Sequence, residues 1–308
     1  MLAATGTSHA KTILLGEHAV VYGEPAIAIP ISSIRLRAQL TPRTDRQQLT
    51  TSAFYTGPLA DATTTRFAGV ATLIRQLLVA FDDVQAGFDL NIISDLPPER
   101  GMGSSAATAV AIVRTFYAAF ETELPHDTLL RWADVSERII HGNPSGIDVA
   151  TTSADRPQWL IRGTSPKTLA APQSGVLVIA DTGVQGQTKL AVAAVATQTR
   201  ASEAARHEIS VLGQVTREGA VALAEDNLQT LGRCLSRAQT SLRHLGVSTP
   251  QIDALVAAAM TNGALGAKLT GSGMGGCVIA LATDVTAANK IVSAMDHAGA
   301  IQVWTHKF

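Results

Sequence analysis

The sequence predicts an α+β protein with two domains. The chain has 308 residues, which is enough for two domains of ordinary size. Its first part opens with short, apolar, partly β-branched runs separated by glycine and proline, a pattern typical of strands and turns. Its last part alternates strand, helix and strand, an order typical of α+β sandwiches. We place the domains at residues 1–174 and 175–308, because a new apolar strand begins near residue 175.

The composition favours an ordered protein with a small ligand. Hydrophobic residues make up 46% and charged residues 16% of the chain, which predicts a packed globule. The 24 basic and 25 acidic residues nearly cancel, which argues against the positive field of a nucleic-acid binder. Cys234 and Cys277 lack any metal-ligand spacing. Without an evident targeting segment or a membrane-length apolar run, we expect a cytoplasmic protein.

The predicted elements of the first domain follow from hydrophobic periodicity. Apolar runs and alternation predict strands at residues 12–15, 26–31, 34–40 and 87–93. Helical spacing predicts helices at residues 68–81, 104–120 and 129–141, with one more turn or short helix opening at Ser145 and Gly146. The polar segment 42–61 is expected to be a loop or hairpin, and the segment 152–172 a loop.

The second domain is predicted in the same way. Strands are expected at residues 176–180, 278–282 and 301–304, and helices at residues 189–212, 217–245, 250–262 and 285–298. The run 104–120 is rich in alanine and has neither glycine nor proline. It predicts a largely buried helix.

Small, permissive residues stand directly before that helix, in the sequence PPERGMGSSAA at residues 97–107. A helix N-terminus presents unpaired amide donors and a partial positive charge, which suit the phosphates of a nucleotide, and glycines let those phosphates approach closely. An ordinary glycine-rich turn with Ser104 as the N-cap explains this segment equally well when it is taken alone. Neither the Walker A spacing nor the protein-kinase glycine loop occurs.

Three segments together resemble the signature motifs of the GHMP kinases in sequence, order and separation. They are KTILLGEHAVVYG at residues 11–23, GMGSSAA at residues 101–107 and KLTGSGMGGC at residues 268–277. The resemblance covers nearly all of the chain. It implies a two-domain α+β GHMP kinase fold, with an N-terminal domain like one of a small-subunit ribosomal protein and a ferredoxin-like C-terminal α/β sandwich.

Within the GHMP kinases, the segment ERIIHGNPSGID at residues 137–148 resembles the mevalonate kinase family. Galactokinases fit less well, since they typically carry arginine where Lys11 stands. Met102 replaces a usual leucine, and Ser272 and Met274 stand where the family often has alanine and glycine. The resemblance implies transfer of the γ-phosphate of ATP to the terminal hydroxyl of mevalonate, in the mevalonate route to isoprenoids. Family members are commonly homodimers.

The resemblance also assigns roles to single residues. Asp148 would take the proton of the substrate hydroxyl or orient it, and Lys11 would favour the developing alkoxide. Ser105 and Glu137 would hold Mg²⁺, whose preferred ligands are hard oxygens. The predicted ATP-binding residues are Pro98, Gly101, Gly103, Ser104, Ser105, Ala106, Gly271 and Gly273. The predicted mevalonate-binding residues are Lys11, Glu17, His18, Asp148 and Thr188.

Each assignment has a structural alternative. Lys11 could be a surface lysine and Asp148 a helix-cap carboxylate. Glu137 could be a solvated glutamate with an i,i+4 contact to His141, and Thr188 could simply start a helix. The glycines at 271–276 also satisfy Gly-x-Gly-x-x-Gly, but they run into a predicted strand, whereas a dinucleotide-binding loop opens a helix.

Three other functions compete with the family's activity. A sibling kinase, such as phosphomevalonate kinase or a sugar or homoserine kinase, would share the motifs, and so would a member that binds without catalysis. A serine-lysine acyl hydrolase built on Ser8 and Lys11 is more distant, because its serine should open a helix, whereas Lys11 leads into a β-branched strand.

Overall fold

The computed structural model describes residues 1–97, 100–142 and 144–308. The chain divides into two compact units, namely unit 1 with Met1–Lys11, Pro30–Pro97 and Gly103–Ala154, and unit 2 with Thr12–Ile29, Pro98–Met102 and Asp155–Phe308. This division differs from the predicted boundary after residue 174. Strands β1 (Ala4–Leu15) and β2 (Ala26–Arg43) are long enough to cross from one unit into the other, and the segment that joins them packs with the C-terminal part of the chain.

Unit 1 is built on a mixed sheet in which β4 (Thr56–Pro58), β3 (Gln48–Thr51), β5 (Gly87–Ser94) and β2 follow one another, and β1 also pairs with β2. Strands β2 and β5 are antiparallel, whereas β3 and β5 are parallel. The residues of β2 alternate between buried and exposed from Ile34 to Leu40, as the sequence pattern predicts. The two strands predicted at 26–31 and 34–40 form one continuous strand.

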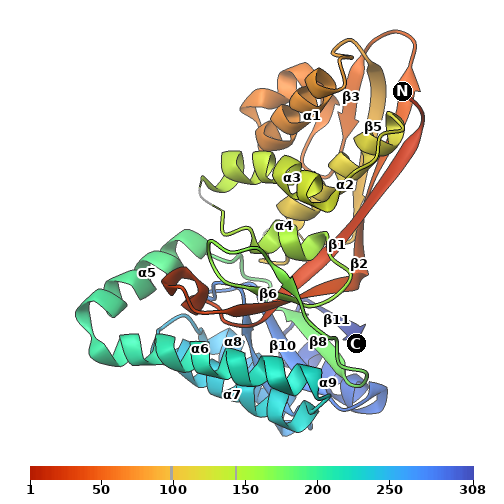
Figure 1. Ribbon diagram of the computed structural model, residues 1–308. Coiled ribbons are helices and arrows are strands. Elements are labelled where there is room, and N and C mark those ends of the chain that lie inside the picture. The colour runs from red at the N-terminus through yellow and green to blue at the C-terminus, as the bar shows by residue number, and fades with distance from the viewer. Residues whose placement is uncertain (98–99, 143) are drawn as a thin grey trace. The chain divides into compact units, whose positions relative to one another are not determined.

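The helices of unit 1 are the 3₁₀ turn η2 (Leu59–Thr64), α1 (Ala68–Ala80), α2 (Ser104–Ala119), α3 (His126–His141) and α4 (Ile147–Thr152). Figure 1 shows α1, α2 and α3 on the same side of the sheet. The predicted buried helix is confirmed, since α2 is covered along most of its length. Phe116 of α2 meets Phe88 of β5 edge to face, with ring centroids 5.6 Å apart.

Unit 2 contains an antiparallel sheet in which β11 (Gln302–Lys307), β8 (Val176–Asp181), β10 (Cys277–Ala282) and β9 (Gly266–Thr270) lie side by side. Helices α5 to α8 connect β8 to β9, and α9 connects β10 to β11. This β-α-β-β-α-β order is that of a ferredoxin-like fold, so the predicted class of the C-terminal domain is confirmed. All residues of β8 and β10 are buried, which explains why both strands are apolar apart from Asp181 at the end of β8.

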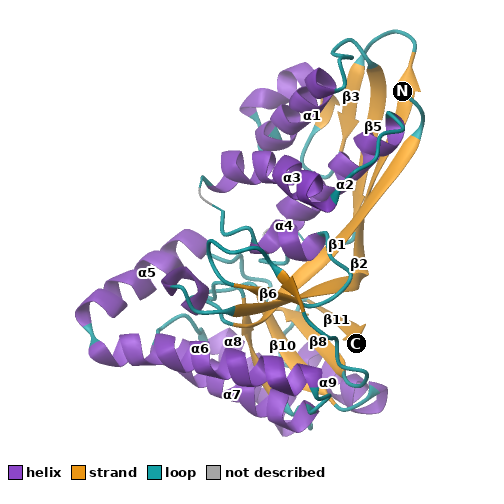
Figure 2. Ribbon diagram, viewed as in Figure 1, coloured by secondary structure: helices purple, strands orange, loops and turns teal. Residues whose placement is uncertain are grey.

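The helices of unit 2 are η1 (Ala19–Tyr22), α5 (Thr188–Ala201), α6 (Glu203–Ala224), α7 (Leu228–His244), α8 (Pro250–Thr261) and α9 (Val285–His297). Figure 2 shows α6 and α7 side by side. The prediction of uninterrupted helices at 189–212 and 217–245 was wrong, because a polar helix-capping residue divides each of these segments. The Ser202 side chain accepts a hydrogen bond from Ala205 N–H, and the Asn227 side chain accepts one from Thr230 N–H.

Two segments that the sequence left irregular also pair. The segment 42–61 holds the β3–β4 hairpin, as one of its two expected forms, with Leu49 opposite Pro58. The loop expected at 152–172 instead carries β6 (Gln158–Leu160) and β7 (Lys167–Thr168). Strand β6 pairs with the first residues of β2, from Ala26 to Ala28. It was not predicted, because it is too short to show a periodic pattern of apolar residues.

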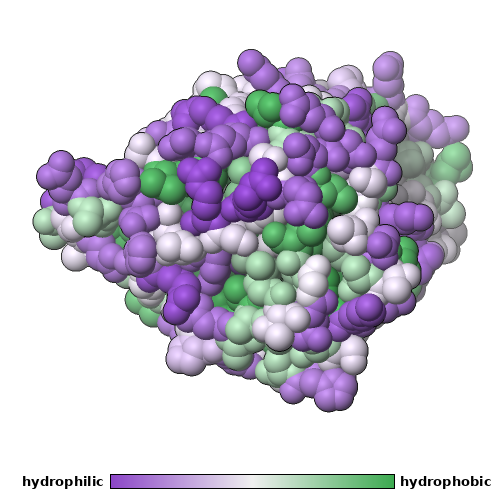
Figure 3. All heavy atoms as spheres, turned by 90° about the horizontal axis from the view of Figure 1, so that it is seen from below, coloured by the Kyte–Doolittle hydropathy of each residue, from purple (hydrophilic) through white to green (hydrophobic). Residues whose placement is uncertain are grey.

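The surface over the helices of unit 2 is mixed in character. Seen from below, it interleaves hydrophilic and hydrophobic residues, and apolar side chains gather near the middle of the view (Figure 3). Such mixing is normal, since much of the exposed surface of any folded protein is apolar. In the part of the chain that the structure describes, no helix is both long and apolar enough to cross a membrane.

Close backbone packing between α7 and β9 generates a stability prediction. A Cβ atom on Gly266 would lie 2.0 Å from the carbonyl oxygen of Gly232, far inside van der Waals contact. Gly266→Ala should therefore lower the free energy of unfolding by about 3 kcal/mol, measured by chemical denaturation. Gly186→Ala is the matched control, since a Cβ there meets no atom within 4 Å. Equal stabilities of the two variants would contradict this packing.

Candidate active site

The site in unit 1 begins with the close approach of β1 to α2. A Cβ atom on Gly6 would lie 2.2 Å from the carbonyl oxygen of Ala111, so only glycine fits there. The Gly6 amide donates to Thr115 Oγ1 at 2.9 Å, and Ser8 Oγ donates to the Ala107 carbonyl at 2.6 Å. These contacts lay β1 directly along α2 and bring Lys11, three residues further on, toward the start of that helix.

Helix α2 opens at Gly103, which is its N-cap residue with φ 77°. Ser104 is the first helical residue, so it is not the side-chain cap that the alternative interpretation required. The amides of the first turn have no acceptors within the helix and face outward along its axis, together with the positive end of the helix dipole. A phosphate group is the ligand that such a terminus favours.

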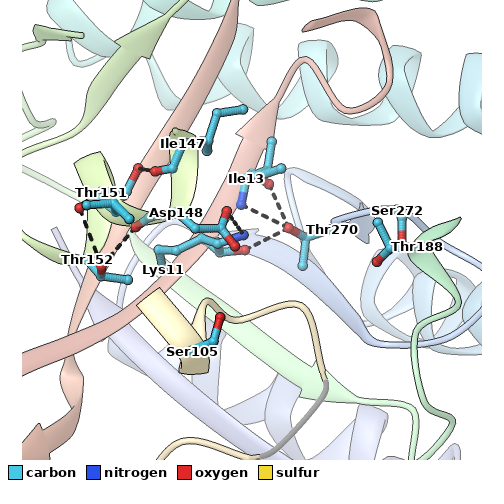
Figure 4. Close-up of polar contacts among 12 residues, drawn as sticks. Lys11, Ile13, Ser105, Ile147, Asp148, Thr151, Thr152, Thr188, Thr270 and Ser272 are labelled. Atoms are coloured by element: carbon cyan, nitrogen blue, oxygen red, sulfur yellow. Dashed lines mark hydrogen bonds and ion pairs between the residues drawn. The ribbon is translucent and has the colours of Figure 1, made fainter. Parts of the chain in front are cut away.

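Lys11 and Asp148 form an ion pair, with 3.0 Å between Nζ and Oδ1 (Figure 4). The Lys11 side chain is 4% exposed and the Asp148 side chain 38% exposed. Asp148 lies in the first turn of α4, which follows Gly146 at φ 78°. The stem of Lys11 packs against Gly103, since a Cβ there would lie 2.9 Å from Lys11 Cγ. Lys11 is therefore no surface lysine, and an accessible carboxylate stands beside a buried ammonium group.

Ser105, Glu137 and His141 form a second polar group beside the start of α2. Ser105 Oγ donates a short hydrogen bond to Glu137 Oε1 and lies 3.3 Å from His141 Nε2. Glu137 is 2% exposed, so it is not the solvated glutamate of the alternative interpretation, although its Oε2 lies 3.8 Å from His141 Nε2. Burial raises the pKa of Glu137 to about 7, the Ser105 hydrogen bond and Lys11 oppose the rise, and Asp148 adds to it.

The Ser105 hydroxyl and the Glu137 carboxylate fit a magnesium ion. Both are hard oxygen donors, and Mg²⁺ usually takes one or two protein oxygens while water and phosphate fill its other positions. A cation would also supply the positive charge that a buried carboxylate needs to stay ionised. Within the described residues, no group of three or more His, Cys, Asp or Glu side chains could hold a metal ion.

Unit 2 brings together His18, Ser272 and Thr188. His18 adopts φ 59°, which is unusual for a residue other than glycine, and its Nε2–H donates to the Ser272 carbonyl at 2.9 Å. Ser272 Oγ donates to Thr188 Oγ1 at 3.1 Å, and the two hydroxyl side chains face each other in Figure 4. Thr188 is the first residue of α5, as its helix-start interpretation predicts, but its hydroxyl is engaged by the third glycine motif.

Glu17 lies next to His18 and is completely buried. Its carboxylate accepts a short hydrogen bond from Lys268 Nζ, and both side chains have an exposed fraction of 0%. Glu17 therefore presents no surface to a ligand, unlike Asp148 in unit 1. Lys268 belongs to the third motif, but the sequence assigned it no role, because a lysine between two apolar neighbours normally suggests a solvent-facing position in a strand.

The third glycine motif joins β9 to β10, so it connects strand to strand as expected and is no dinucleotide-binding loop. Gly271 and Gly273 have positive φ angles, and so does Met274, at φ 55°. Met274 thus holds a conformation that glycine would adopt without strain. Its amide donates to the Val247 carbonyl at 2.8 Å, which holds the turn in place.

One contact near the site lies beyond what the sequence indicated. Arg100, directly before the second motif, donates from Nε to Asp181 Oδ2 at 2.9 Å, at the end of β8. This ion pair anchors the chain just before Gly101, and no periodicity or motif pointed to Asp181, which the sequence places at the end of an apolar strand. Pro98, one of the predicted ATP-binding residues, lies outside the described residues.

Comparison with known proteins agrees with this arrangement. The profile of the GHMP kinases N terminal domain matches residues 67–155, and that of the GHMP kinases C terminal region matches residues 220–301. A mevalonate kinase of Aeropyrum pernix is 32% identical over 91% of this chain and 88% of its own. A mevalonate kinase of Pyrococcus horikoshii is 32% identical over 89% of this chain and 87% of its own.

The crystal structure of L. major mevalonate kinase in complex with R-mevalonate superposes with a TM-score of 0.84 at 26% identity, over 98% of this chain and 95% of that one. The chain belongs to the mevalonate kinase family. Members of this family are ATP-dependent small-molecule kinases of the GHMP superfamily, and so is this protein. The resemblance stated from the motifs is confirmed.

The contact between Gly103 and Lys11 generates a second prediction. Gly101 and Gly103 have φ angles of 78° and 77°, so alanine is strained equally at both. Only Gly103→Ala also pushes a methyl group against the Lys11 stem, since a Cβ on Gly101 meets none of the described residues within 4 Å. Gly103→Ala should therefore lower the free energy of unfolding by about 1 to 3 kcal/mol more than Gly101→Ala, measured by denaturant titration. Equal losses would contradict the contact.

The raised pKa of Glu137 predicts how stability depends on pH. Between its ordinary value of 4.5 and about 7 the folded chain keeps a proton that the unfolded chain releases. The free energy of unfolding should thus fall as pH rises through this window, with Glu137 contributing about 3 kcal/mol. Denaturant titrations from pH 4.5 to 7 should show a smaller fall for Glu137→Gln, while the exposed control Glu123→Gln should match the parent. An unchanged profile for Glu137→Gln would refute the assignment.

Proposed function

We propose that the protein transfers the γ-phosphate of ATP to the terminal hydroxyl of mevalonate, giving 5-phosphomevalonate and ADP. The observation that carries the proposal is the pairing of the accessible Asp148 with the buried Lys11 at the opening of α2. Phosphoryl transfer needs a positioned hydroxyl, an in-line phosphate and positive charge around the oxygens. Unit 1 has a candidate for each of these parts, and the relatives named mevalonate kinase cover nearly the whole chain.

The nucleotide phosphates would lie at the N-terminus of α2. Gly101 and Gly103 leave the backbone open to close approach, and the amides of Ser104, Ser105 and Ala106 have no acceptor within the helix. The predicted set also includes Pro98, and Gly271 and Gly273 of the third motif. Ser105 and Glu137 would hold Mg²⁺, which when bound neutralises phosphate charge and favours the phosphoryl transfer.

Asp148 would act as the base. Its carboxylate is exposed enough to reach a bound hydroxyl, and Lys11 next to it favours the negative charge that develops on the hydroxyl oxygen. As that proton moves to Asp148, the oxygen attacks the γ-phosphorus and the bond to the bridging oxygen of ADP breaks. Lys11 needs no conformational change to contribute, because its stem is already packed against Gly103.

In unit 2, His18 and Thr188 would contact mevalonate. The Nε2–H of His18 is used by the Ser272 carbonyl, so in a neutral ring Nδ1 is the acceptor. Burial lowers the pKa of His18 and favours that neutral ring, while the Ser272 hydrogen bond opposes the shift. This state suits the tertiary hydroxyl of mevalonate better than its carboxylate. Glu17 could touch the substrate only if its buried pair with Lys268 opened.

The competing functions have weaker support. A serine-lysine hydrolase would need Ser8 and Lys11 together, but three residues apart on one strand they point to opposite faces, and each already has another partner. Phosphomevalonate kinase activity remains the alternative, because it uses the same superfamily motifs. A cytoplasmic location and a homodimer stay predictions of the resemblance.

The test of the proposal is the variant Asp148→Asn, with Asp45→Asn as the control that removes a surface carboxylate paired with Arg43. Coupled ADP release with mevalonate should fall by about 10³-fold or more in Asp148→Asn, because the base is lost, while nucleotide binding survives. Asp45→Asn should match the parent protein. Galactose, homoserine and phosphomevalonate should not support turnover, and a preference for phosphomevalonate would overturn the proposed specificity.

A further inference from the structure

The ion pair of Lys268 and Glu17 is the most deeply buried charge pair among the described residues, with both side chains at 0% exposure. Lys268 Nζ donates to the Glu17 carboxylate and to the Leu269 carbonyl, the latter at 2.6 Å. Removing two charges from water is unfavourable, and a well-packed apolar pair often stabilises a fold as well or better. Stability alone therefore does not explain why these two charges are buried together.

The two charged residues flank the contact between His18 and Ser272. Glu17 immediately precedes His18, and Lys268 is the middle residue of β9, three residues before the loop 271–276 begins at Gly271. His18 holds a left-handed backbone conformation that persists only when its surroundings fix it. The pair holds the segment of His18 close to the segment of Ser272. This spacing allows the His18 Nε2–H to donate to the Ser272 carbonyl at 2.9 Å.

A further link fixes the same two segments. Thr270 Oγ1 lies 2.9 Å from Thr12 Oγ1, and the Ile13 amide donates to Thr270 Oγ1 at 3.0 Å (Figure 4). Strand β9 is thus attached to the last part of β1 through Thr270 and to Glu17 through Lys268. Ser272, in the loop, links this segment to α5, because its hydroxyl donates a hydrogen bond to Thr188 Oγ1 at 3.1 Å.

We propose that the buried Lys268–Glu17 pair positions His18 and the Ser272 loop for mevalonate, so that both charged residues support binding without touching the substrate. This inference rests on the proposed function. It makes Lys268 a positioning residue of the site, and it gives Glu17 the same role in place of direct contact. The substrate class concerned is a hydroxy acid, whose hydroxyl meets the acceptor nitrogen of His18.

The charge of the substrate gives the pair a second use. Mevalonate is an anion, and an uncompensated glutamate directly behind His18 would repel it through a medium of low dielectric constant. Lys268 cancels that charge at the place where it arises. Loss of Lys268 alone should therefore weaken substrate binding more than loss of both charges, and a pair that served stability alone would give no such order.

The experiment compares Lys268→Met, the double variant Glu17→Gln with Lys268→Met, and a control that neutralises an exposed pair of the same unit, Glu218→Gln with Arg237→Met. Mevalonate KM, ATP KM, kcat and Tm are measured for each. The double variant should raise mevalonate KM about tenfold and leave ATP KM within about twofold. Lys268→Met should raise mevalonate KM further, and the control should match the parent in both constants.

The inference is overturned if the double variant keeps the parent's mevalonate KM, or if the KM values of both substrates rise together. A parent protein that does not phosphorylate mevalonate would instead overturn the proposed function. If neither buried-pair variant folds, ¹⁵N NMR of the unmodified protein decides, with His18→Gln to assign the signal. It should show His18 as the neutral Nε2–H form at pH 7, and a charged or Nδ1–H ring would refute the positioning.

Discussion

The contact of β1 with α2 is the constraint on which the unit 1 site depends. Gly6 allows the strand to lie against the carbonyl of Ala111, and Gly103 leaves room for the stem of Lys11 where the helix begins. These close contacts fix the direction of β1 relative to the axis of α2. The helix end that we propose binds phosphate, and the ammonium group next to the proposed base, then come from rigid elements, which is what precise positioning requires.

That geometry also concentrates charge. Lys11 pairs with Asp148 and at the same time lowers the pKa of Glu137, while Asp148 and burial raise it. One ammonium group is thus shared by two acids with different surroundings. Asp148 is partly open to solvent and Glu137 is not, so the first can exchange a proton with a substrate, whereas the second is better suited to a metal ion. Environment separates the roles of two chemically similar side chains.

The sequence was most informative where chemistry and local structure coincide. Helix α2 and its glycine start could be predicted, because motif spacing and helical periodicity point to the same segment. The roles of Ser105, Glu137 and Asp148 stay predictions of the motif resemblance. The breaks at Ser202 and Asn227 could not, since a single capping residue in a long amphipathic pattern resembles an ordinary polar position. The two-unit division was hidden because strands β1 and β2 continue past it.

Lys268 was unpredictable for a different reason. Its partner Glu17 lies 251 positions away, and nothing local distinguishes a buried lysine from an exposed one in a strand. The comparison with Lys11 shows that the exposure of the paired acid determines what each lysine can do. Lys11 faces an acid that is open to solvent, so its pair can take part in proton transfer. Lys268 faces an acid that is closed, and desolvation lowers its own pKa. A pair that neither solvent nor substrate can reach acts through the backbone segments that it joins.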